Sequence, residues 1–222
     1  MATMIAATLM PDRVLSFDIM PGTLGLLRES MAEGGPRIKC YQGSVTLVSP
    51  GETHEATGQR LIILILAICG ELKIPHSPLG STYFSLPKGS KDSGYEPDQS
   101  YYIQSHGTAA WGQAPDLAIE IVVSHSEKKA LACGVLLGIP EIWVLDIPRH
   151  RLTFHRLVQR GKHKGTYQPQ SHSRAFPPLS SSEVLGRLDD PEKDGTAFHE
   201  NCRSWAAEVL VPRRRGRGEG EG

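Results

Sequence analysis

The sequence predicts a mixed α/β domain in which helices flank a central β-sheet. Segments typical of β-strands alternate with longer segments of helical periodicity through most of the chain. Residues 117–124 form a nearly continuous apolar run, as expected for a strand at the centre of a mixed sheet with both faces covered. A carboxylate, Glu120, interrupts this run, and burying an unpaired charge there would cost several kcal/mol. We therefore expect a partner that holds this charge.

The first third of the chain predicts a short helix, a β-hairpin and a long helix. Residues 24–31 place leucines and a methionine at helical spacing. From Arg37 to Val48, apolar and polar residues alternate around a turn at residues 42–44, which predicts a hairpin. A helical pattern then extends over residues 52–71, with a polar beginning and an apolar remainder, as in a helix with one exposed and one buried end.

The middle third predicts most of the central sheet. Its expected strands are residues 79–85, 99–103, 117–124, 141–146 and 151–158. A helix is expected over residues 126–137, where Gly138 is placed to end it. Polar or small-residue loops at 87–94 and 105–114 connect the strands.

The last third carries weaker signals. One short strand is expected at residues 166–168, within a polar and basic stretch. Ser180 and Glu183 have the spacing of a capping box at the start of a short helix. Residues 196–210 predict an amphipathic helix. Residues 213–222 consist largely of Arg, Gly and Glu, and this low complexity predicts disorder.

The length and charge of the chain restrict the class of protein. A chain of 222 residues is long enough for one domain with a real core and some appendages. Lys and Arg number 24, and so do Asp and Glu, so the formal net charge is zero and no overall basic field attracts nucleic acid. This disfavours a dedicated DNA-packaging or repressor role. It does not exclude a nuclease, because an acidic metal site offsets a local basic groove.

Cysteine usage and hydropathy indicate a cytoplasmic protein. Cys40, Cys69, Cys133 and Cys202 are widely spaced and form no Cys-x-x-Cys pair, so buried free thiols are expected instead of a zinc ribbon or a disulfide framework. The most apolar stretch, residues 61–69, is far shorter than the roughly 20 residues of a membrane-spanning helix. The N-terminus lacks the basic start of a secretory signal.

Two carboxylates stand out as a candidate site. Asp98 follows a proline and opens one expected strand, while Glu120 lies within another. If these strands are neighbours, both acids face one point, and two hard oxygen donors at one point are typical of a Mg²⁺ site. A turn aspartate after proline is a simpler explanation for Asp98 alone. That explanation is weaker for Glu120, because strand interiors seldom hold an unpaired carboxylate.

A second Pro-Asp pair competes for the same role. Asp116 also follows a proline, and it precedes the strand that contains Glu120. Four residues of extended strand separate the two acids by about 13 Å, which is too far for a shared ion. We therefore prefer Asp98 to Asp116.

Several strings of residues resemble a known protein family. They are Gly43-Ser-Val-Thr-Leu-Val-Ser-Pro50 with His54-Glu55, Gly80-Ser-Thr82, Glu96-Pro-Asp-Gln-Ser-Tyr-Tyr-Ile103, Pro115-Asp-Leu-Ala-Ile-Glu-Ile121 and Leu137-Gly-Ile-Pro-Glu-Ile-Trp143. In these strings the chain resembles the Uma-type family of restriction-endonuclease-like proteins, within the PD-(D/E)XK nuclease superfamily. The resemblance extends from Val14 to Leu210. It implies a restriction-endonuclease-like αβββαβ core, with a mixed central β-sheet flanked by helices, an N-terminal β-hairpin and a C-terminal helical extension.

The resemblance also implies a domain organisation. Residues 1–35 are then an N-terminal segment with a short helix, and residues 36–158 are the PD-(D/E)XK nuclease-like domain. Residues 159–212 are an extension that packs on the core, and residues 213–222 are a disordered tail.

By this resemblance the protein is expected to be an endonuclease that hydrolyses DNA phosphodiester bonds by metal-activated water. The implied cofactor is Mg²⁺, or Mn²⁺ in its place, with Asp98, Glu120 and the main-chain carbonyl of Ile121 as metal ligands. Such an ion keeps several waters, lowers the pKa of one of them and neutralises charge on the scissile phosphate. A homodimer is expected if the enzyme cuts both strands.

The expected basic residue is missing from its usual place. In the superfamily a lysine stands two residues after the glutamate, where this chain has Val122. The family commonly moves a basic residue to the next helix, so Lys129 is the preferred candidate and Lys128 the second. The register of Lys129 is one residue off, and a solvated pair of lysines is the alternative.

The first long helix supplies two further candidates. Glu55 resembles the extra acid that many such nucleases present from this helix, where it holds the metal through water. A favourable interaction with the helix dipole explains an acid there equally simply. His54 is a weaker candidate.

Two other functions remain open. One is a catalytically impaired nuclease-fold protein that binds nucleic acid or acts in regulation, as favoured by Val122, by the zero net charge and by Gly134 in place of the family's usual aromatic residue. The other is a metal-dependent phosphohydrolase that acts on a nucleotide or on RNA.

Overall fold

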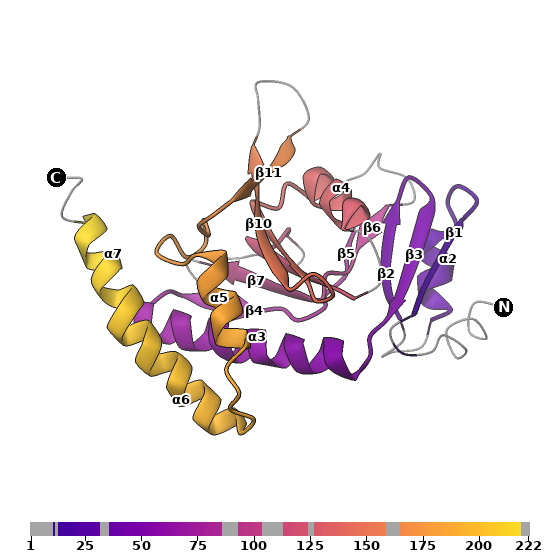
Figure 1. Ribbon diagram of the computed structural model, residues 1–222. Coiled ribbons are helices and arrows are strands. Elements are labelled where there is room, and N and C mark those ends of the chain that lie inside the picture. The colour runs from indigo at the N-terminus through magenta and orange to yellow at the C-terminus, as the bar shows by residue number, and fades with distance from the viewer. Residues whose placement is uncertain are drawn as a thin grey trace.

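Two β-sheets and the helices that flank them make up the structure (Figure 1). This computed structural model describes residues 11, 13–31, 36–85, 93–103, 113–123, 127–158 and 165–218. The mixed α/β class expected from the sequence is confirmed. The arrangement differs in one respect, because the expected N-terminal hairpin is part of a second sheet and not an appendage of a single one.

The N-terminal sheet is entirely antiparallel and has the order β1-β3-β2-β6-β5. Its strands are β1 (Arg13–Asp18), β2 (Arg37–Tyr41), β3 (Ser44–Ser49), β5 (Phe84–Ser85) and β6 (Gly94–Tyr95). The expected hairpin is confirmed as β2 and β3. Gln42 and Gly43 connect these strands with φ angles of +51° and +81°, the positive values that a tight hairpin turn requires.

The central sheet has the order β11-β10-β9-β8-β7-β4. Its strands are β4 (His76–Pro78), β7 (Gln99–Ile103), β8 (Leu117–Val122), β9 (Glu141–Asp146), β10 (Arg151–Val158) and β11 (Thr166–Gln170). Only β8 and β9 pair in parallel among these strands, so the sheet is mixed, as expected. Every residue of β8 and β9 is buried, which confirms that the apolar run lies at the centre.

The strand expected over residues 79–85 is wrong. The chain forms β4 before this range and only the short β5 at its end. Gly80 has a φ of +60°, which an extended strand does not accommodate, and the main-chain N–H of Leu79 donates to the carbonyl of Ser100. The segment therefore leaves the central sheet and enters the N-terminal one.

Helices cover both faces of the central sheet (Figure 1). The described helices are α2 (Leu24–Glu29), which packs on the N-terminal sheet instead, and α3 (Glu52–Leu72), α4 (Lys128–Leu137), α5 (Ser181–Leu188), α6 (Gly195–Trp205) and α7 (Val211–Gly218), with a π-helical turn (Ala206–Leu210) between the last two. α3 packs on one face together with α5 and α6, and α4 packs on the opposite face. The capping box expected at Ser180 and Glu183 is present at the start of α5.

The helical C-terminus is longer than the sequence predicts. α7 extends into residues 213–222, for which disorder is expected, and residues 219–222 lie outside the described part. Arg213 donates to the Glu183 carboxylate at 2.6 Å, and Arg214 donates to the main-chain carbonyl of Leu72. These contacts join the helix to α5 and to the end of α3, so the basic residues have partners that composition does not reveal.

Alternation along β8 decides which side chains meet which helix. Ile119 and Ile121 belong to the core that includes α3. Ala118 and Val122 belong to a second core that includes α4 and Tyr95. Glu120 has the parity of this second set, so it points to the α4 side of the sheet, where the N-terminal sheet also lies.

The residues that the structure describes include no helix with both the length and the apolar character needed to cross a membrane. All four cysteines are free and buried, as expected from the sequence.

The buried thiols should be unreactive in the native protein. Burial raises the pKa of Cys69 and of Cys133 to about 12, so their reactive thiolate is scarce at neutral pH. We expect Ellman's reagent to modify these thiols slowly in buffer and rapidly in guanidinium chloride. Rapid modification of Cys133 in a folded Cys40→Ala, Cys69→Ala, Cys202→Ala variant would contradict this packing.

Two helical glycines should respond in opposite ways to alanine. A Cβ at Gly134 of α4 would lie 2.4 Å from Ile142 Cδ1 and 2.6 Å from the Tyr167 hydroxyl, so Gly134→Ala should destabilise the fold by about 1–3 kcal/mol. A Cβ at Gly70 of α3 would meet no atom within 4 Å, so Gly70→Ala should stabilise the fold by about 0.5–1 kcal/mol. Urea unfolding of both variants measures these changes, and equal responses would exclude the close contact of α4 with β9 and β11.

Candidate functional site

Asp98 lies where the chain passes from one sheet to the other. Residues 96–98 connect β6 of the N-terminal sheet to β7 of the central sheet. The Glu96 N–H donates to the carbonyl of Ile38 at 3.1 Å, and the Ile38 N–H donates to the Glu96 carboxylate at 3.3 Å. The Asp98 N–H donates to the carbonyl of Ile119 at 3.0 Å. Main-chain bonds to both sheets therefore fix the position of Asp98.

Glu120 stands opposite Asp98 on the adjacent strand. β7 and β8 are antiparallel with Gln99 paired to Ile119, and the register continued by one residue places Asp98 across from Glu120. Directly opposed residues share a face of the sheet and have neighbouring Cβ atoms. Both side chains are buried, with 1% of Asp98 and none of Glu120 exposed. The structure thus brings together the two acids that the sequence singles out.

Three donors bind the Asp98 carboxylate. Arg37 Nη1 donates to Oδ1 at 2.7 Å, the Ile121 N–H donates to Oδ2 at 2.6 Å, and His54 Nε2 lies 3.3 Å from Oδ2. Burial opposes ionisation of Asp98, but the charge of Lys39 and the donors on the carboxylate outweigh it and hold its pKa well below the ordinary value. Asp98 is therefore an anion.

Glu120 has two side-chain donors. The Tyr95 hydroxyl donates to Oε1 at 2.6 Å, and Lys39 Nζ donates to Oε2. Burial nevertheless raises the pKa of Glu120 to about 7, against the attraction of Lys39. Burial alone would lower the pKa of the Lys39 ammonium. The negative charges of Glu120 and Asp98 outweigh this effect, so the pKa is raised. Of the two acids, Glu120 is therefore the one that takes up a proton more readily, although Lys39 binds it.

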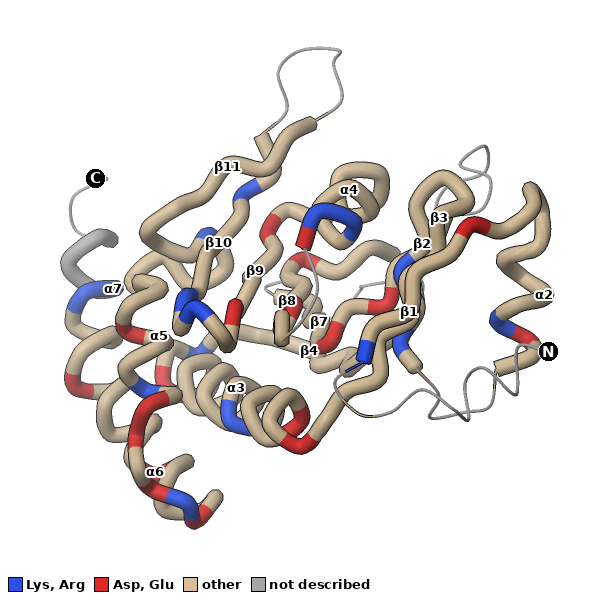
Figure 2. Tube along the Cα trace, turned by 45° about the vertical axis from the view of Figure 1, so that its right-hand side comes forward, with Lys and Arg blue, Asp and Glu red and all other residues tan. Residues whose placement is uncertain are grey.

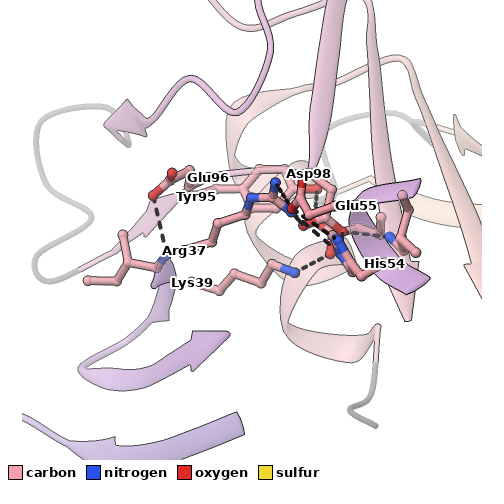
Figure 3. A network of polar contacts seen from close by, with 10 residues as sticks. Arg37, Lys39, His54, Glu55, Tyr95, Glu96 and Asp98 are labelled. Atoms are coloured by element: carbon pink, nitrogen blue, oxygen red, sulfur yellow. Dashed lines mark hydrogen bonds and ion pairs between the residues drawn. The ribbon is translucent and has the colours of Figure 1, made fainter. Parts of the chain in front are cut away.

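Both cations come from β2, as Figure 3 shows for their side chains. Arg37 and Lys39 are two residues apart and therefore point to the same face of the strand. Arg37 binds Asp98 and Lys39 binds Glu120, so one strand of the N-terminal sheet supplies a cation to each acid of the central sheet. Arg37 Nη2 also donates to Glu55 at 3.0 Å.

The other candidate residues differ in how close they come to the acids. Glu55 and His54 lie in the first turn of α3 and join the network through Arg37 and Asp98. His54 is buried, whereas 48% of the Glu55 side chain is exposed. Glu55 therefore marks the solvent side of the network.

The lysines of α4 take another direction. Lys129 Nζ donates to Thr46 Oγ1 at 2.7 Å and to Ser44 Oγ at 3.3 Å, both on β3, and no contact of Lys129 with the acid pair is present among the described residues. Lys128 begins α4. Asp116, the rejected aspartate, binds the Ile103 N–H at the opposite end of β7.

Sequence reasoning missed Arg37, Lys39 and Tyr95. The alternation of β2 was visible, but its polar face reads as solvent-exposed in an isolated hairpin. The signal that could have found Arg37 and Lys39 is the charge of the two acids, because two buried carboxylates require cations and β2 carries two on one face. Tyr95 stands three residues before Asp98 and gives no separate signal.

The donor set fits a hard divalent cation in kind. Asp98 and Glu120 offer carboxylate oxygens from adjacent strands. The Ile121 N–H points to Asp98, and because N–H and C=O of one strand residue face the same neighbour, its carbonyl leaves β8 on that side too. Mg²⁺ commonly takes one or two carboxylates and keeps several waters. No cluster of three or more His, Cys, Asp or Glu with metal-binding geometry exists among the residues described.

Charged residues are otherwise dispersed over the fold. Figure 2 shows Lys, Arg, Asp and Glu spread over the helices and over strands of both sheets, whereas β3, β4, β5, β6, β7 and β11 contain none of them. This distribution agrees with the zero net charge. Asp98 and Glu120 are among the few charged residues of the described part that are buried, together with Lys39, Glu141 and Asp146.

Comparisons with known proteins give a match to one family model and a similarity to a solved structure. The model of the family described as "Uma2: Putative restriction endonuclease" matches residues 26–214. A crystal structure titled as a "putative nuclease belonging to DUF820", from Anabaena variabilis ATCC 29413, is 17% identical and has a TM-score of 0.47, with 69% of this chain and 92% of that chain covered. No curated protein matches the sequence.

The Lys39–Glu120 pair should show strong energetic coupling. Lys39→Met leaves a buried carboxylate without its cation, and Glu120→Gln leaves a buried ammonium, so each should cost about 3–5 kcal/mol in urea unfolding with EDTA present. The double variant should cost clearly less than the sum. As a control, Arg203→Met breaks the exposed pair with Glu71 and should cost under about 1 kcal/mol. Additive costs at positions 39 and 120 would show that the pair contributes nothing as a unit.

Proposed function

The chain belongs to the Uma2 family, described as "Putative restriction endonuclease", and from this membership we propose that it is a metal-dependent endonuclease that hydrolyses phosphodiester bonds of DNA. The observation that carries the proposal is the placement of Asp98 opposite Glu120, both buried, on adjacent strands of a mixed sheet. A buried acid pair of this kind is costly to maintain unless its charge is used or compensated.

In the proposed site, Asp98, Glu120 and the main-chain carbonyl of Ile121 would hold Mg²⁺ or Mn²⁺. Such an ion, when bound, supplies acidified water and neutralises charge on the scissile phosphate. The remaining residues orient the ligands. The Ile121 N–H and His54 fix the Asp98 carboxylate, and the Tyr95 hydroxyl fixes Glu120. A carboxylate held in one orientation loses little entropy when a cation binds.

Three further residues have proposed roles at the edge of this site. Glu55 is the exposed end of the network, which suits an acid that contacts the ion through water at the solvent side. Lys129 and Lys128 are the sequence's candidates for the lysine that orients the attacking water. Their position in α4 supports this role less than the position of Lys39 does, because Lys129 is engaged by Thr46 and Ser44.

A second function deserves testing on one specific observation. Each carboxylate of the acid pair already binds a side-chain cation, Arg37 for Asp98 and Lys39 for Glu120. This favours a nuclease-fold protein that binds nucleic acid without cutting it. Binding of a DNA duplex together with no cleavage in Mg²⁺ or Mn²⁺ would support this second function.

The proposed activity predicts that the purified protein nicks supercoiled plasmid DNA in Mg²⁺ or Mn²⁺ and stops when EDTA is added. Asp98→Asn and Glu120→Gln should reduce cleavage to the level without enzyme, because each removes an anionic ligand. Asp116→Asn is the matched control, since it alters the other Pro-Asp aspartate, and it should retain activity. Conversion of nicked to linear DNA, with a dimeric mass in solution, would support the proposed homodimer.

Two outcomes would contradict the proposal. Cleavage by Asp98→Asn and Glu120→Gln at the parental rate would place the activity elsewhere or in a contaminant. Absence of cleavage by the folded parent protein, over a range of Mg²⁺ and Mn²⁺ concentrations, would favour the binding function.

A further inference from the structure

Lys39 is buried to a degree that is rare for a lysine. Only 2% of its side chain is exposed, and Nζ binds Glu120, which is fully buried. Lysine is almost never buried unless it is paired, so the contact with Glu120 explains its position. The ammonium thus occupies one of the carboxylate oxygens that the proposed metal would use.

The contact belongs to a matched set of charges. Arg37 lies two residues before Lys39 on β2 and binds Asp98 at 2.7 Å. Each member of the acid pair therefore binds one cationic side chain of β2. A hard divalent cation requires surplus negative charge and free oxygen lone pairs, and Lys39 reduces both at Glu120.

The two cations are not equivalent. Arg37 divides its fork between Asp98 and Glu55, so it is held at two points. Lysine carries a compact charge at the end of a flexible stem. Its ammonium can move away from a single carboxylate oxygen, whereas a planar guanidinium that is held at two points must break both contacts. Lys39 is therefore the cation that can be exchanged for another.

We propose that Lys39 is a tethered cation that competes with a divalent metal ion for Glu120, so that the acid pair binds metal only when the ammonium leaves this carboxylate. This inference rests on the proposed function for the identity of the ligands. It adds that the chain limits its own metal affinity, and it assigns to Lys39 a role that neither Lys128 nor Lys129 fills.

The test is direct metal binding, without DNA. Mn²⁺ alone is titrated into the metal-free full-length protein, with calorimetry for affinity and the paramagnetic resonance signal for free Mn²⁺. Lys39→Met removes the charge and keeps an unbranched apolar stem. Its dissociation constant for Mn²⁺ should be lower than that of the parent by about tenfold or more. Lys193→Met, which removes an exposed lysine between α5 and α6, should leave the constant unchanged.

A double variant tests whether the added Mn²⁺ affinity of Lys39→Met arises at Glu120. Lys39→Met combined with Glu120→Gln should lose the added affinity, because the vacated oxygen no longer carries charge. Equal or weaker Mn²⁺ binding by Lys39→Met, an equal gain in Lys193→Met, or a gain that survives Glu120→Gln would each overturn the inference.

The variant's stability provides a second readout. If Lys39→Met or Lys39→Gln is unfolded in EDTA, Mn²⁺ should restore its circular dichroism spectrum, because a ligand that binds only the folded state stabilises it. Failure of Mn²⁺ to refold either variant would also overturn the inference.

Cleavage assays separate this inference from the proposed function. A gain of Mn²⁺ affinity in Lys39→Met, with no cleavage by any variant, would sustain the tethered cation and reject the nuclease. Cleavage by the parent without a gain of affinity in Lys39→Met would do the reverse.

Discussion

The arrangement of this protein depends on the cost of burying two carboxylates side by side. Asp98 and Glu120 face each other across two strands and are removed from water. Like charges at this spacing repel, and desolvation adds to the cost, so the fold requires compensating charge at this point. Arg37 and Lys39 supply it from the other sheet. The ion pairs therefore decide how the two sheets meet.

Other contacts at the junction of the sheets follow the same geometry. Glu96 and Ile38 exchange hydrogen bonds that bind the connecting segment to β2, which brings Asp98 within reach of Arg37. On the face of the N-terminal sheet that carries Lys39, the Cys133 thiol of α4 donates to the Cys40 carbonyl at 3.3 Å. Small side chains at this contact let α4 approach closely. The N-terminal sheet is thus bonded to the central sheet by charge and to α4 by close packing.

Local elements could be predicted from the sequence because periodicity is a local property. The strands β7, β8 and β9 and the long helix α3 were all evident, and so was the choice of Asp98 over Asp116 as the acid that faces Glu120. The partners of the acids were not evident from the sequence, because alternation distinguishes the two faces of a strand but does not indicate which face another sheet will cover. In an isolated hairpin the side chains of Arg37 and Lys39 would be exposed, whereas here the central sheet lies against β2 and Lys39 is buried. For the same reason the sequence indicates a basic residue on α4, next to Glu120 in the chain, although the nearest ammonium in space comes from β2.

One contact thereby serves both folding and the candidate site, and these two roles oppose each other. The pair of Lys39 and Glu120 stabilises the folded chain only while the ammonium remains on the carboxylate. In the proposed site, metal binding at Glu120 would first break that pair, so the cost of separation would be subtracted from the intrinsic affinity of the oxygen ligands. A stronger ion pair would then give a more stable protein and a weaker metal site, and a weaker pair would give the opposite. Under this proposal, the strength of this single contact decides whether the buried acids act as structural anions or as metal ligands.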